Sequence, residues 1–164
     1  MISCILYLCL LAIMVTAPLK LYRSSGPKMC RFYARMLALV SARKLYRLVV
    51  FILLLLFHYL HLRVHTADQG VLLSTPVMFT FFGLMNTEKW LFRLHDHRKV
   101  AIVVAFTVLV MAFVPVLYTQ AVTLAVLLLA AMLHPSQAAV ILAKDKDMQE
   151  MFTNDRKTLS TVYY

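Results

Sequence analysis

A run of cations between two apolar blocks constrains this chain more than any other feature of its sequence. Residues 1–19 and 48–62 are almost continuously apolar, and no Asp or Glu lies in residues 20–47 between them. Uncompensated cations beside apolar spans hold a loop on the cytoplasmic side of a membrane. We therefore expect this basic stretch to be cytoplasmic. Its cations are Lys20, Arg23, Lys28, Arg31, Arg35, Arg43, Lys44 and Arg47.

The composition supports a membrane protein. Hydrophobic residues make up 62% of the chain and charged residues 15%. Soluble domains have about 45–50% apolar and about 25% charged residues. The 164 residues have room for four to six spans at about 20 residues each. We predict an all-α fold, a polytopic transmembrane helical bundle.

The net charge of +10 is compatible with two kinds of partner. In a soluble chain it would suggest nucleic-acid binding. Here the cations flank apolar spans, so anionic lipid headgroups are the expected partners, and we predict no nucleic-acid binding. The side chains expected to face headgroups are Lys28, Arg31, Arg35, Arg43, Lys44 and Arg47.

Hydrophobicity places about five spans along residues 1–143, followed by a cytoplasmic tail at 144–164 whose last residues we expect to be disordered. The first block lacks a basic n-region, which favours a retained membrane helix over a signal peptide. The predicted spans are residues 2–19, 45–62, 71–90, 100–117 and 121–143.

Prolines mark the third, fourth and fifth of these spans as irregular. In the fourth, Pro115 lies near the outer end, where the carbonyl of Met111 loses its helical partner. Ser74-Thr75-Pro76 is typical of a helix start, so a third helix that begins at Pro76, or a re-entrant or tilted one, is an alternative to a full span. In the fifth span Pro135 predicts a kink, with the carbonyl of Ala131 losing its helical partner.

A basic amphipathic helix is expected over residues 28–44. Its apolar side chains share one face, and cations occupy the neighbouring face. Such a helix lies in the membrane interface, or packs against the bundle of its own chain. The apolar face consists of Met29, Phe32, Tyr33, Met36, Leu37 and Val40.

The distribution of cations also predicts the orientation. With five spans, every Lys and Arg except Arg63 falls on the cytoplasmic side, so the N-terminus is outside and the C-terminus cytoplasmic. A four-span arrangement without the third segment is poorer. It places Arg93, Arg98 and Lys99 outside, or reverses the tail.

A row of histidines is the most suggestive chemical pattern. His58, His61 and His65 follow one side of the second span, and His134 lies in the fifth. Imidazoles on one helical face can bind a transition metal or haem. The alternative is that they are solvated or bond to a neighbouring helix. We predict no cofactor, with haem or a transition metal as the alternative.

Signatures of catalysis are missing. The span interiors contain no Asp, Glu, Lys or Arg, although coupled transport usually relies on carboxylates there. With three glycines the chain has no phosphate-binding loop, and it has no serine elbow or HExxH motif. We therefore predict that the protein is not an enzyme.

Small residues at helical spacing suggest contacts between helices. Ala101 and Ala105 lie in the fourth span, and Ala121 and Ala125 in the fifth. They pack these two helices together or contact a partner chain. We predict a non-catalytic subunit or accessory protein that binds other membrane proteins or itself, with a small oligomeric transporter as the alternative. By analogy with small bacterial proteins of this build, we expect a bacterial inner membrane.

Overall fold

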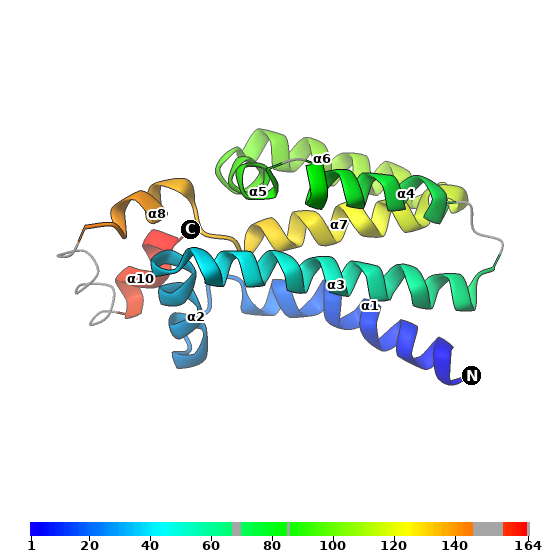
Figure 1. The fold of residues 1–164 in the computed structure, drawn as a ribbon, viewed down its shortest axis with the longest axis horizontal. Helices are drawn as coiled ribbons and strands as arrows, with labels where there is room; N and C mark the ends of the chain where they lie inside the picture. Colours follow the sequence, from blue (N-terminus) through cyan, green and yellow to red (C-terminus); the bar gives the residue numbers. More distant parts are fainter. Residues whose placement is uncertain (67–69, 85, 146–155, 164) are drawn as a thin grey trace.

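The computed structural model describes residues 1–66, 70–84, 86–145 and 156–163. All regular structure in these ranges is helical, which confirms the all-α class. The longer helices run side by side along the long axis, and the short helices at residues 27–38, 137–142 and 156–163 gather at one end (Figure 1). The longer elements are α1 (Ile2–Leu21), α3 (Val40–Val64), α4 (Gly70–Phe79) with the π-helix η1 (Thr80–Leu84), α6 (Arg98–Ala112) and α7 (Tyr118–Met132). The shorter ones are α2 (Pro27–Ala38), α5 (Thr87–Asp96), the 3-10 turn η2 (Pro115–Leu117), α8 (Gln137–Leu142) and α10 (Arg156–Tyr163).

Three helical stretches of the described chain are long and apolar enough to cross a membrane: Ile2–Leu21, Val40–Val64 and Pro115–Leu142. A fourth candidate is the pair Gly70–Gly83 and Thr87–Asp96, whose two halves meet at an angle of 100°. The expected count of about five is not reached by these criteria. The shortfall comes from α6, since its 15 residues extend about 22 Å, against about 30 Å of hydrocarbon.

Some boundaries differ from the sequence-based expectation. The helix expected over residues 28–44 ends at Ala38, because Leu39 has an extended backbone (φ −113°, ψ 118°) and α3 begins at the next residue. Pro76 lies inside α4 instead of at a helix start. The Thr75 hydroxyl donates back to the carbonyl of Val71 at 2.7 Å, as it does within a helix, and Ser74 Oγ lies 3.3 Å from the same carbonyl.

The main core lies where α1, α3, α4 and α7 meet. Leu54 and Phe57 of α3 and Met78 of α4 are fully buried there, against Leu127 of α7. Since α3 and α7 each contact α1 and α4, this four-helix core holds the long part of the molecule together.

A second core joins α2, α8 and α10 at one end of the molecule. The Tyr163 ring lies 4.2 Å from the Tyr33 ring, and both side chains are fully buried. The expectation that the last residues are disordered is therefore wrong for residues 156–163. Here Leu159 and Tyr163 of α10 pack against Met36 of α2, and this burial orders the helix.

The helix predicted to kink at Pro135 is interrupted there, because α7 ends at Met132 and α8 begins at Gln137, although the two together remain one candidate span. Carbonyls freed at a helix end need other donors, especially away from water. Side chains from three other helices donate here: Tyr46 Oη to Ala130 O (2.7 Å), His95 Nδ1 to Ala131 O (2.9 Å) and Tyr163 Oη to Leu133 O (2.7 Å). The break thus joins α3, α5 and α10 to α7.

Candidate functional site

The first part of the candidate site is an arginine–glutamate cluster, formed by Arg43, Arg47 and Glu88. Arg43 Nε donates to Glu88 Oε1 at 2.7 Å, and Arg47 Nη2 lies 3.5 Å from Glu88 Oε2. Arg43 Nη1 also donates to the carbonyls of Met36 and Leu37, at 2.8 and 3.2 Å. One guanidinium therefore connects the last turn of α2, the first turn of α3 and the start of α5.

Arg43 does not face the lipid headgroups, contrary to the prediction. Its side chain is 8% exposed, so it faces the protein interior, where the Glu88 carboxylate and two carbonyls compensate the buried charge. Arg47 is 20% exposed. The other predicted headgroup-facing residues, Lys28, Arg31, Arg35 and Lys44, are exposed.

The second part is an aromatic groove between α3 and η1, with a volume of about 390 Å³. The Phe51 ring of α3 lies 5.7 Å from the Phe79 ring and 5.1 Å from the Phe82 ring. Basic side chains complete the groove, whose size falls within the range of ligand-binding pockets. Its lining is Lys44, Arg47, Leu48, Phe51, Phe79, Phe82, Gly83 and Thr87.

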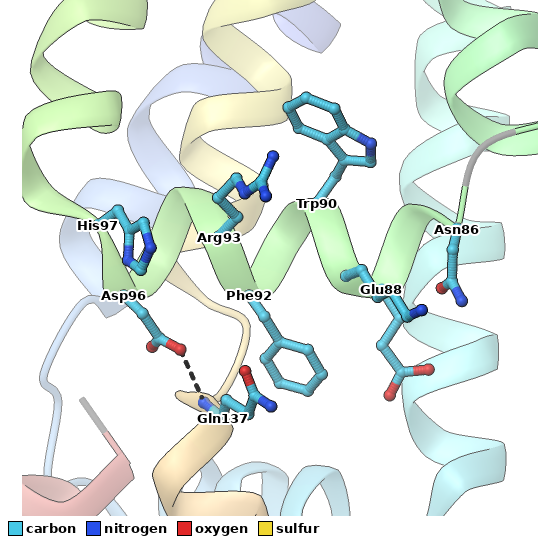
Figure 2. A pocket seen from close by; sticks show the side chains of 9 residues that line it. Asn86, Glu88, Trp90, Phe92, Arg93, Asp96, His97 and Gln137 are labelled. Atoms are coloured by element: carbon cyan, nitrogen blue, oxygen red, sulfur yellow. Dashed lines mark hydrogen bonds between the residues drawn. The ribbon is translucent and has the colours of Figure 1, made fainter.

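The third part is a polar hollow of about 670 Å³ along α5 (Figure 2). Phe92 and Asp96 point from α5 toward Gln137, whose backbone N–H donates to Asp96 Oδ2 at 3.2 Å. The Arg93 guanidinium lies 5.3 Å from the centre of the Trp90 ring. Charges of both signs line the hollow, so it suits a polar partner of mixed charge. Its lining is Asn86, Glu88, Lys89, Trp90, Phe92, Arg93, Asp96, His97 and Gln137.

His134 lies at the α7–α8 break, apart from the other predicted histidines. Its ring is 4.7 Å from the Phe92 ring and 6.3 Å from the Tyr46 ring. Its Nε2 is buried, without a hydrogen-bond partner among the described residues. Tyr46 precedes His58 by twelve residues on α3, about 18 Å along the helix. The structure therefore does not bring His134 to the histidine row.

Both ring nitrogens of His58 contact protein atoms. Nδ1 lies 2.7 Å from the carbonyl of Leu54, and Nε2 lies 2.8 Å from Ser74 Oγ. A metal ion at either nitrogen would have to displace that contact. His58 thus connects α3 to α4 through Ser74, and the Thr123 hydroxyl of α7 lies 3.5 Å from Nε2.

The other two histidines of the row lie toward the end of α3. His61 is buried, with Nδ1 3.2 Å from Tyr7 Oη, whereas His65 is exposed. Their rings are 4.9 Å apart. Within the described ranges, no group of three or more His, Cys, Asp or Glu side chains is placed to hold a metal ion. Haem or metal binding stays a hypothesis.

The small residues of α6 and α7 have different environments. Ala121 is buried, Ala101 and Ala125 are partly buried, and Ala105 is exposed. Apart from Ala101, the partly buried side chains of α6 are larger: Val100, Val104, Val108 and Met111. Of these, Val100 and Val104 pack against a cluster that includes Ala131 of α7. Close packing of α6 on α7 therefore leaves Ala105 uncovered.

Sequence reasoning missed Glu88 as the partner of two arginines, and it missed the donors at the α7–α8 break. Glu88 and Arg43 are separated by 45 residues, and no spacing rule relates them. The break at Pro135 was itself a usable signal, because every freed carbonyl requires a donor.

No protein-family model, curated protein or solved structure matches this chain. The observations above define a class: a protein whose described residues form helices, three of them suited to cross a membrane, or four if the bent pair counts as one span.

Proposed function

We propose that this chain is a small integral membrane protein that acts as a non-catalytic subunit or accessory protein of a membrane complex. The surface of α6 carries the proposal. No residue of α6, which the structure describes throughout, is buried. Its large side chains point outward, with Ile102, Phe106 and Leu109 being 57%, 65% and 57% exposed.

A stripe of small residues on α6 supplies the contact. Ala101, Ala105 and Ala112 lie at i, i+4 and i+11, so they share one face beside the side chains that pack toward α7. Apolar surface alone does not bring helices together in lipid, whereas small residues let two backbones approach closely. We propose that this stripe receives a transmembrane helix of a partner protein.

We propose that the chain crosses the bilayer about five times, in a bacterial inner membrane. The successive elements α1, α3, α4 with η1, α6 and α7 run in alternating directions along the long axis (Figure 1), which supports this path. In this arrangement α6 crosses together with η2. The N-terminus is outside, α8 completes the last span together with α7, and α2, α5 and α10 lie on the cytoplasmic side.

A photocrosslinking amino acid at position 105 tests the partner contact. In the native membrane we expect an adduct with one larger polypeptide, and the substitution Ala101→Leu should abolish it by holding the helices apart. The matched control is the same photocrosslinker at Ala12, an exposed position on α1, which should not give that adduct. Adducts only between copies of this chain, or the same adduct at both positions, would contradict the proposal.

A further inference from the structure

We propose that the aromatic groove binds one anionic phospholipid of the cytoplasmic leaflet. Its phosphate lies against Lys44 and Arg47, and an acyl chain lies along Phe51, Phe79 and Phe82. This inference rests on the membrane placement proposed above, and it is independent of the partner contact on α6.

The order of side chains along the groove matches the order of groups in a phospholipid. Lys44, Arg47, Leu48 and Phe51 lie at i, i+3, i+4 and i+7, on one face of α3. The cations come first, and Phe51 follows about 10 Å beyond Lys44 and about 6 Å beyond Arg47 along the helix. A lipid at a membrane surface likewise passes from a charged headgroup to apolar chains over a short depth.

Positive charge remains available at the basic end. Glu88 is shared by two guanidinium groups, and it lies closer to Arg43 (2.7 Å) than to Arg47 (3.5 Å). Arg47 Nε is buried and has no hydrogen-bond partner in the described part of the chain. Together with exposed Lys44, Arg47 provides donors and charge for a phosphate.

The apolar part of the groove is open. Leu48 is 51% and Phe79 52% exposed, although both line the same hollow. A Cβ atom built on Gly83 would meet nothing within 4 Å, so no side chain of the described protein fills the space beside it. An acyl chain would cover these surfaces, and the adjacent cations select a lipid over a neutral apolar ligand.

Native mass spectrometry of the purified protein in a neutral detergent tests the site, with phosphatidylglycerol and phosphatidylcholine as probes. We expect one phosphatidylglycerol to bind more tightly than phosphatidylcholine. Lys44→Gln and Arg47→Gln should each lower the affinity for phosphatidylglycerol about fivefold, which is the factor per cation expected at an anionic surface. Gly83→Leu, which fills the groove, should weaken both lipids.

Matched controls distinguish binding in the groove from diffuse attraction to the basic surface. Arg31→Gln and Arg35→Gln remove exposed α2 charges outside the groove, and each should change the affinity less than twofold. Losses equal to those of the groove variants would show diffuse attraction and overturn the site, as would unchanged binding in Gly83→Leu. Displacement of the lipid by millimolar inorganic phosphate would indicate a site for free phosphate and would overturn the proposal of a lipid site.

The lipid proposal and the partner proposal can fail separately. Ala101→Leu should abolish the partner adduct and leave phosphatidylglycerol binding unchanged. Loss of lipid selectivity with an intact adduct would overturn only the lipid site. If a partner protein occupies the groove, the purified complex will bind no phosphatidylglycerol there. This result would also count against the proposal of a lipid site.

Discussion

Glu88 should be essential for holding α5 on the rest of the protein. Its carboxylate compensates Arg43, a cation whose side chain is 8% exposed. Removing one partner of a buried ion pair leaves an uncompensated charge, which destabilises the protein more than the pair itself stabilises it. We therefore predict that Glu88→Gln lowers the free energy of unfolding and weakens the attachment of α5.

The magnitude follows from the geometry. Across the 2.7 Å between Arg43 Nε and Glu88 Oε1, the attraction of unit charges is about 6 kcal/mol at an effective dielectric constant of about 20. Most of this gross attraction is offset by desolvation. Moreover, the Glu88 side chain is 22% exposed, and a glutamine amide still accepts one hydrogen bond. We expect a net loss of about 2–3 kcal/mol, below the 3–5 kcal/mol for fully buried pairs.

The assay is a titration with sodium dodecyl sulfate from mild detergent micelles, followed by tryptophan emission. Trp90 is the one tryptophan in the sequence, and it lies on α5 close to Glu88, so its emission reports the helix under test. Lys89→Gln is the matched control. It removes an exposed charge from the same helix and should change the free energy of unfolding by about 0.5 kcal/mol or less.

A double-mutant cycle with Arg43→Gln isolates the pairwise term. We expect Arg43 and Glu88 to be coupled by at least about 1 kcal/mol, as contacting charged residues are. Equal effects of Glu88→Gln and Lys89→Gln, or a coupling energy near zero, would refute the reasoning that this pair holds α5 in place.

Three further results are expected. Tyr163→Phe removes the buried donor at the α7–α8 break and should lower the free energy of unfolding by about 1–3 kcal/mol, whereas the exposed Tyr59→Phe should have little effect in the same titration. Ser74→Ala deprives His58 of a buried contact at 2.8 Å and should cost about 1–2 kcal/mol; no change in the midpoint would contradict the assigned hydrogen bond. Reporter fusions should place the N-terminus outside and the C-terminus in the cytoplasm; both termini on one side would exclude five spans.

Much of the fold is predictable because it depends on local chemistry. A continuous apolar run must satisfy its backbone hydrogen bonds internally, so the helix predicted at residues 2–19 is present as Ile2–Leu21. Pro135 removes an amide donor and interferes with the preceding turn, so the disruption and the freed carbonyl of Ala131 could be anticipated from one residue. The basic character of α3 at Lys44 and Arg47 could also be predicted, because both cations are read directly from the sequence.

The pairing of these segments could not be predicted, because an all-apolar helix has no periodicity to show which face packs. Of the 20 residues of α1, only Tyr7, Leu10 and Met14 are buried, and the neighbouring residues are equally apolar. The candidate site depends on contacts between distant segments. Arg43 meets Glu88 across 45 residues, and the groove closes only because η1 packs beside α3. Such contacts arise from the three-dimensional packing of whole helices, whereas sequence patterns record only the local preferences of each one.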